Sequence, residues 1–83
     1  MPKIPRDISG KELAKLLGKK FSYQLVREVG SHIRLSCTRS SNEHKLTIPD
    51  HKTIKIGTLN SILKDISDYL SISKAELLNK LFE

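Results

Sequence analysis

The chain has 83 residues and a formal net charge of +6 at pH 7. A chain of this length folds as one small domain, 1–83, and cannot hold both a hydrophobic core and an internal cofactor cavity. Lys and Arg outnumber Asp and Glu by 12 to 5 in residues 1–55, whereas 56–83 hold 3 against 4. Such uneven positive charge attracts nucleic acid, and it would equally attract an acidic protein. A solvated basic surface without a partner is the remaining alternative.

The cysteine and histidine content excludes several kinds of site. Cys37 is the single cysteine, so the sequence holds no disulfide framework and no cysteine-paired zinc site. The spacing of His32, His44 and His51 does not favour a metal site, and we expect no metal and no small-molecule cofactor. No apolar run approaches the length of a membrane span, and the first residues lack the apolar core of a signal peptide. We therefore expect a cytoplasmic protein with no membrane contact.

The first predicted helix has clear signals at both ends. Pro2 and Pro5 favour an extended segment over 1–8. Ser9 and Glu12 have the spacing of a capping box, and glycine at position 18 favours a helix end. These signals predict a helix over 10–18.

Three strands are predicted next. Apolar and polar residues alternate over 21–28, 31–38 and 44–48, a period that is typical of β-strands. Gly30 marks the turn between the first two strands, and the polar residues 39–43 predict a hairpin loop of four to five residues. Three consecutive short strands of this kind predict an antiparallel meander.

Two further helices complete the prediction. Apolar residues recur at helical spacing over 58–70, with Thr58 as the cap, and a second capping box from Ser73 to Glu76 starts a short C-terminal helix. The fold class is therefore α+β, ordered α-β-β-β-α, with a core over 9–70 and a helical extension over 71–83. The extension is expected either to pack on the sheet edge or to join two copies through three apolar residues, Leu78, Leu81 and Phe82.

The helices are expected to cover one face of the three-stranded sheet and to leave the other face exposed. By alternation, the exposed face carries four polar side chains, His32, Arg34, Lys45 and Thr47. Imidazole exchanges protons near neutral pH, and RNA cleavage by internal transfer needs a base and cations at the phosphate. The pattern is compatible with His32 as the base, flanked by Arg34 and Lys45 as the cations at the phosphate. A lone histidine on a strand is, however, more often a surface residue than a catalyst.

Lys52 and Lys55 come just before the predicted helix over 58–70. The free N–H groups and partial positive charge of a helix N-terminus bind phosphate, so this segment is a second candidate contact. An ordinary helix start with solvated lysines is the alternative.

Three motifs in order carry a resemblance to a known family. They are Arg27-Glu28-Val29-Gly30-Ser31-His32, then Leu46-Thr47-Ile48-Pro49-Asp50-His51, then Ile56-Gly57-Thr58-Leu59-Asn60-Ser61-Ile62-Leu63-Lys64. From about Ser9 to Asp68 the chain resembles the HicA (YcfA-like) toxins. It departs from the family pattern at Leu35, where an aromatic residue is frequent, and at Lys20, where a glycine is usual.

The resemblance implies a fold similar to a double-stranded-RNA-binding domain and a toxin of a type II toxin–antitoxin system. Such toxins are mRNA interferases, endoribonucleases that cleave mRNA without the ribosome and without a metal, and their catalytic histidine corresponds to His32. The partners implied are single-stranded mRNA and a HicB-type antitoxin that blocks the active site. The expected RNA-binding residues are Ser31, Arg34, Lys45, Lys52 and Lys55. A non-catalytic RNA-binding module and a protein-interaction domain remain as alternatives that would use the same basic face.

Overall fold

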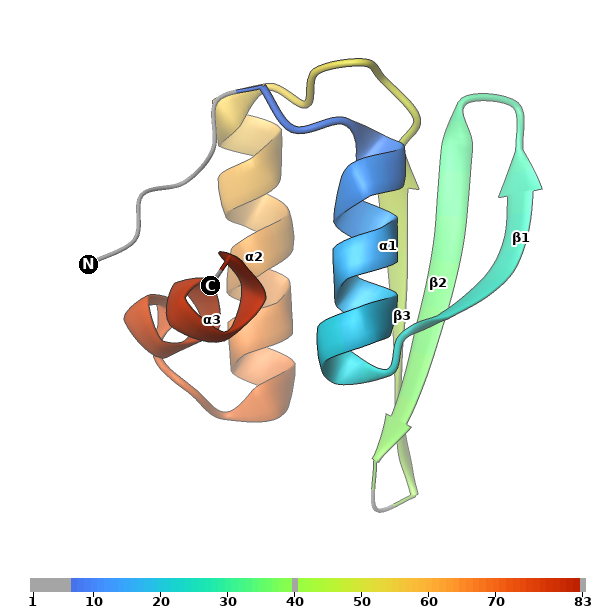
Figure 1. Cartoon of the computed structure of the whole chain (residues 1–83). Coiled ribbons are helices and arrows are strands. Elements are labelled where there is room, and N and C mark those ends of the chain that lie inside the picture. The colour runs from blue at the N-terminus through green and yellow to red at the C-terminus, as the bar shows by residue number, and fades with distance from the viewer. Residues whose placement is uncertain (1–6, 40, 83) are drawn as a thin grey trace.

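The computed structural model describes residues 7–39 and 41–82, which form a three-stranded sheet with three helices on one side (Figure 1). The elements in chain order are α1 (Gly10–Phe21), β1 (Gln24–Val29), β2 (His32–Arg39), β3 (Asn42–Pro49), α2 (Ile56–Leu70) and α3 (Lys74–Phe82). The predicted order α-β-β-β-α with an added C-terminal helix is confirmed. Most of the extended segment predicted over 1–8 lies outside the described residues.

Helix α1 begins where the capping signal predicts but ends three residues later than expected. The backbone N–H of Glu12 donates to Oγ of Ser9 at 3.0 Å. The prediction that Gly18 ends the helix is wrong, because Ser22 takes the left-handed conformation of the C-cap, with φ of 62°. A Cβ at position 18 would lie 3.1 Å from the backbone oxygen of Tyr23. Gly18 therefore allows the chain that leaves the helix to return closely past it.

The strands form an antiparallel meander in the order β1-β2-β3, as predicted. The first strand begins at Gln24, three residues after the predicted start at residue 21, because Phe21 ends α1 and is buried. The second hairpin is tighter than the loop predicted over 39–43, since Arg39 pairs directly with Asn42. Within β1 the register shifts between Leu25 and Arg27, so that Val26 is an additional residue in a β-bulge.

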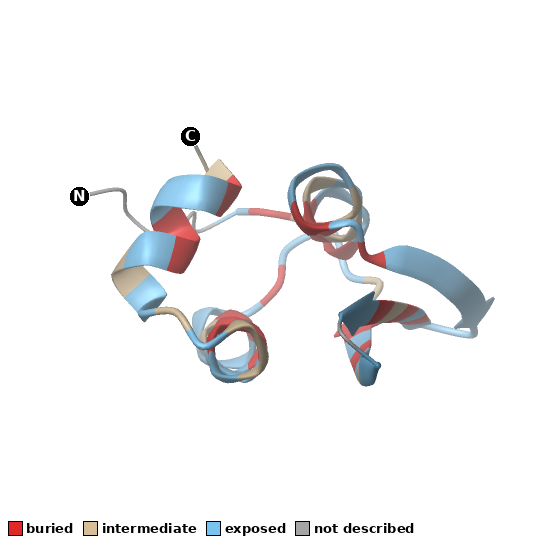
Figure 2. Cartoon of the chain, turned by 90° about the horizontal axis from the view of Figure 1, so that it is seen from below, coloured by how far each residue is buried: buried red, intermediate tan, exposed pale blue. Residues whose placement is uncertain are grey.

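The core lies between the helices and the inner face of β2 and β3 (Figure 2). Leu13 and Leu17 of α1 and Ile48 of β3 are fully buried there. In contrast, every residue of β1 is exposed. Figure 1 shows β1 curving away from α1, so this strand pairs with β2 without being covered by a helix.

Helix α2 starts earlier than predicted, and its cap differs. Lys55 is the N-cap and makes no side-chain cap hydrogen bond, so the prediction of a helix that Thr58 caps is wrong. Helix α3 begins as predicted, with the N–H of Glu76 donating to Oγ of Ser73 at 3.1 Å. It packs against α1 and α2. The described contacts of α3 therefore support neither of the two expected roles, because its apolar side chains complete the core of the same chain.

Candidate functional site

His32 is the first residue of β2 and is exposed on the open face of the sheet, the face opposite the helices. The turn before it has two residues, because Val29 pairs with His32, and Gly30 adopts a φ of 58°. That left-handed conformation is readily available to glycine and costs other residues free energy. Ile33, next along the strand, is buried on the inner face. Alternation along β2 therefore holds the imidazole of His32 on the solvent side.

Two arginines lie directly opposite each other on this open face. Arg34 of β2 pairs with Arg27 of β1, and both side chains are exposed. Paired residues of this kind have Cα atoms only about 4.5–5.5 Å apart, and like charges placed so closely repel each other. Neither arginine forms an ion pair with a residue of segments 7–39 or 41–82. The pair is therefore suited to an external anion that would relieve the repulsion.

Arg27 is a candidate site residue that the sequence analysis did not find. Assignment of the two-residue turn would have revealed it, because a hairpin that pairs Val29 with His32 also pairs Arg27 with Arg34. The bulge at Val26 comes just before Arg27 in the sequence. Because of this additional residue, Gln24 and Leu25 lie on the faces opposite to those that strict alternation from Arg27 would give them.

The open face is hollowed next to the arginine pair. A depression of about 270 Å³ lies between β1, β2 and β3, and its polar lining includes Arg27, Arg34, Ser36, Lys45 and Thr47. Arg34 is about 7 Å along the strand from His32. His32 does not line the depression, which extends from the arginine pair along β2 and β3 toward Lys45 and Glu43.

Lys45 lies on the open face, as predicted, but it does not flank His32. His32 pairs with Pro49, and Lys45 is four residues further along β3, or about 13 Å. Its Nζ is 4.0 Å from Oε1 of Glu43. Lys45 therefore belongs to the far end of the depression, and the expectation that it stands beside the imidazole is wrong.

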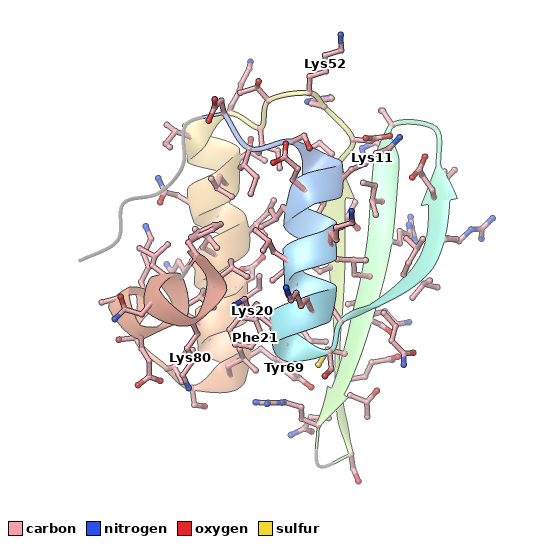
Figure 3. All side chains as sticks on the ribbon, in the orientation of Figure 1. Lys11, Lys20, Phe21, Lys52, Tyr69 and Lys80 are labelled. Carbon is pink, nitrogen blue, oxygen red and sulfur yellow. The ribbon has the colours of Figure 1, made fainter. Side chains whose placement is uncertain are left out.

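The remaining predicted site residues lie at the end of the sheet where β2 begins. The backbone oxygen of Ser31 accepts a hydrogen bond from the N–H of Asp50 at 2.7 Å, which fixes the turn before His32 to the loop after β3. Lys52 is exposed in that loop and points away from the body of the protein (Figure 3). Lys55 is exposed as the N-cap of α2. These lysines share one end of the molecule with His32, but they lie outside the depression.

The N-terminus of α1 is packed tightly against the same loop. The N–H of Gly10 donates to the backbone oxygen of His51 at 3.0 Å. A Cβ at position 10 would lie 2.1 Å from the backbone oxygen of Pro49, so only glycine fits there. Helix α1 thus determines where β3 ends, and β3 pairs with the start of β2 at His32.

The other two histidines differ in their surroundings. His51 is exposed in the loop, whereas His44 is half-buried in β3 with its Nδ1 2.7 Å from the hydroxyl oxygen of Tyr23. The His44 ring also stacks on Tyr69 at a centroid distance of 4.7 Å. Burial raises the pKa of the Tyr23 phenol well above its usual range, which keeps the phenol protonated as a donor. His44 is therefore part of a structural hydrogen-bond network.

Replacing Tyr23 with phenylalanine is expected to lower the free energy of unfolding by about 1–3 kcal/mol, because the partly buried ring nitrogen of His44 loses its partner. Urea unfolding of Tyr23→Phe, His44→Ala and the double variant measures the coupling. Additive losses would contradict the hydrogen bond.

The raised pKa of the Tyr23 phenol adds a second readout. The free energy of unfolding of the wild type should fall as pH rises above about 10, because the phenol ionises there in the unfolded chain, and Tyr23→Phe should weaken that fall.

Potential metal ligands do not converge in the described part of the chain. No group of three or more His, Cys, Asp or Glu side chains there is placed to hold a metal ion. Cys37 is buried, and its Sγ lies 3.5 Å from the backbone oxygen of Phe21. No described helix is long and apolar enough to cross a membrane.

The fold and the site together define a small α+β domain with an uncovered, basic sheet face that carries an exposed imidazole. The sequence model of the family described as HicA toxin of bacterial toxin-antitoxin matches residues 10–67, from the start of α1 into the last part of α2. The chain therefore belongs to the HicA toxin family, as the motifs indicated. Comparison with curated proteins and with solved structures gave no match. Membership in this family implies an antitoxin as partner.

Proposed function

We propose that this HicA-family toxin is an endoribonuclease that cleaves single-stranded mRNA on the open face of its sheet, with His32 as the proton-transfer residue. The observation that carries the proposal is the position of an exposed imidazole next to the opposed pair Arg27 and Arg34. The pair supplies an anion site, and the imidazole supplies a base within two residues of it along β2. Both are needed for chemistry at a phosphodiester.

The proposed reaction is internal transfer. His32 takes the proton of a 2′-hydroxyl, and the oxygen attacks the adjacent phosphorus. The bond from phosphorus to the 5′-oxygen breaks, and the leaving oxygen takes a proton from water. Arg27 and Arg34 stabilise the negative charge that builds on the phosphate. The chain itself supplies the groups for these steps, so the proposal includes no metal and no cofactor.

Further lysines are proposed to hold RNA away from the reacting phosphate. Lys45 lies at the far end of the depression, and Lys52 and Lys55 lie beyond the other end, so the backbone of a bound strand would meet cations on both sides of His32. Ser31 contributes the turn that positions His32. We also propose that a HicB-type antitoxin blocks this face and that the protein acts in the cytoplasm.

The direct test incubates the purified protein with end-labelled single-stranded RNA in EDTA and resolves the products on a gel. Fragments that form in EDTA would support metal-independent cleavage. A shift of the RNA without fragments would contradict cleavage and leave an RNA-binding module. If the RNA is neither cleaved nor shifted at moderate salt, both the endoribonuclease and the RNA-binding module are contradicted. A domain that binds only proteins then remains.

Replacing Arg27 and Arg34 together with glutamine is expected to weaken RNA binding and its dependence on salt. Each phosphate contact contributes about 0.7 to the slope of log affinity against log salt for a single strand, so the slope should fall by about 1.4. Fluorescence anisotropy with labelled RNA over a salt series measures it. The double variant Lys19→Gln and Lys64→Gln removes two charges from exposed lysines on α1 and α2 and is the control for net charge. An equal loss in that control would contradict a specific arginine site.

A further inference from the structure

An apolar groove separates α1 from β1 on the helix side of the sheet, away from His32. Buried side chains of β2, Ile33 and Leu35, contribute to its lining together with Ala14 of α1 and Leu25 of β1. Its volume is about 300 Å³. Leu25 is 62% exposed although it faces this groove. Figure 2 shows β1 exposed along its whole length, so no described element covers the groove from outside.

Strand β1 is also an edge of the sheet. Its one strand neighbour among the described residues is β2, so its outer backbone groups are free to pair. Among the described residues, four large hydrophobic side chains are exposed, and three of them lie on this strand, namely Leu25, Val26 and Val29. An exposed apolar edge is a site at which another chain adds a strand. A strand added beside β1 would direct alternate side chains toward α1 and into the groove.

The charges around the groove indicate the chemistry of the added strand. Lys11 and Lys15 of α1 contribute to its lining, and Glu28 of β1 is the acidic residue there. Lys15 has no ion-pair partner among the described residues 7–39 and 41–82. Nζ of Lys11 lies 3.9 Å from Oδ2 of Asp50. On the other side of β1, Arg27 is exposed on the open face. A strand with apolar residues toward the groove would place its acidic residues on the side of Arg27. Lys11 and Lys15 add positive charge beside the groove, which also favours an acidic strand.

We propose that this edge and groove dock an extended segment of a protein partner in which apolar and acidic residues alternate. A second copy of the chain is disfavoured because each copy carries a net charge of +6. RNA is disfavoured because the groove is mainly apolar and its one aromatic lining residue, Tyr23, is buried. The proposal concerns the helix side of the sheet and does not depend on RNA cleavage.

The test uses NMR on the isotope-labelled full chain with two capped nine-residue peptides. In one peptide valine alternates with glutamate, and in the other lysine replaces glutamate. The acidic peptide is expected to shift the amide signals of Gln24–Val29 and of the α1 residues Lys11 and Lys15, and to slow hydrogen exchange in β1. The basic peptide is expected to shift none of them.

Variants locate the binding. Leu25→Asp places a negative charge in the groove and removes an apolar contact. It should therefore lower the affinity for the acidic peptide about tenfold or more. Lys15→Glu should weaken it about twofold to fivefold, because a negative charge beside the groove repels the acidic peptide. Lys19→Glu makes the same charge change one turn along α1, outside the groove lining, and Ile56→Asp replaces an exposed apolar residue on α2; both should bind normally.

Three outcomes would overturn the proposal. The first is the absence of shifts at β1 with peptide concentrations up to about 1 mM, which is the range of weak association. The second is binding that Leu25→Asp leaves unchanged or that maps to the open face. The third is perturbation of the groove signals by single-stranded RNA, or by increasing concentration of the protein alone, which would identify RNA or a second copy as the occupant. The cleavage assay in EDTA is scored separately, so its failure leaves these results unaffected.

Discussion

Replacing His32 with alanine is expected to abolish RNA cleavage while the protein stays folded and keeps its affinity for RNA. Removal of a proton-transfer group typically lowers the rate about 10²- to 10⁴-fold. The side chain is exposed and makes no hydrogen bond with another residue of the described chain, so its loss removes no packing. Arg27 and Arg34 remain to hold the phosphate. The measurement is the initial rate of cleavage of labelled RNA, with unfolding in urea as the check on the fold.

The chain offers a matched control for this variant. His51 is also an exposed histidine, and it lies in the loop that borders the turn before His32. His51→Ala should therefore cleave RNA at close to the wild-type rate, apart from any contribution to binding. Expression in growing cells gives a second readout, because only the wild type and His51→Ala should arrest growth. Cleavage by His32→Ala at the wild-type rate would show that another residue carries the proton, and the proposed mechanism would then fail.

Replacing Leu81 with alanine is expected to lower the free energy of unfolding by about 2–5 kcal/mol. Leu81 is fully buried on α3, and this helix packs against α1 and α2. The smaller side chain leaves a cavity in the hydrophobic core cluster to which Leu81 belongs. Small domains have total stabilities of only about 5–15 kcal/mol, so the variant is expected to unfold at low urea concentration.

Asn79→Ala is the control for Leu81→Ala, because Asn79 is exposed on the same helix. Urea unfolding followed by circular dichroism should show the two variants far apart. If α3 were an appendage that served only to join two copies, Leu81→Ala would change the molecular mass in solution and leave the monomer's stability unchanged. That result would contradict the packing described above. The family match ends at residue 67, so this test also asks whether the last helix belongs to the folding unit.

The fold was predictable where the signals are local. Ser9 and Ser73 cap their helices through hydrogen bonds three residues along the chain, and both caps are found where the sequence places them. Alternation in β2 and β3 predicted which side chains face the core, because that core lies on one face of the sheet. The two-residue period of apolar and polar residues in these strands was therefore sufficient to predict their inner and outer faces.

The errors arose where distant residues decide the local structure. Gly18 looked like a helix end, but it serves the close return of the chain at Tyr23. The site was predicted in part, since His32 and Arg34 share the open face as expected, whereas Lys45 is too far along β3 to act beside the imidazole. Arg27 was missed because its partner depends on the hairpin register and on the bulge at Val26. The role of His44 depends on Tyr23 and Tyr69, which approach it only in the folded chain.

Because every residue of β1 is exposed, sequences of this kind can diverge in this strand at little cost to the fold. No side chain of Gln24–Val29 is buried, so most substitutions in this strand leave the hydrophobic core unchanged. The same strand contributes Arg27 to the open face and Leu25 to the groove. Selection could therefore change what the protein recognises through β1 while the helices and the other two strands maintain the fold. Related chains that bind different partners are accordingly expected to vary more at Leu25, which lines the groove, than at Arg27, which belongs to the proposed RNA site.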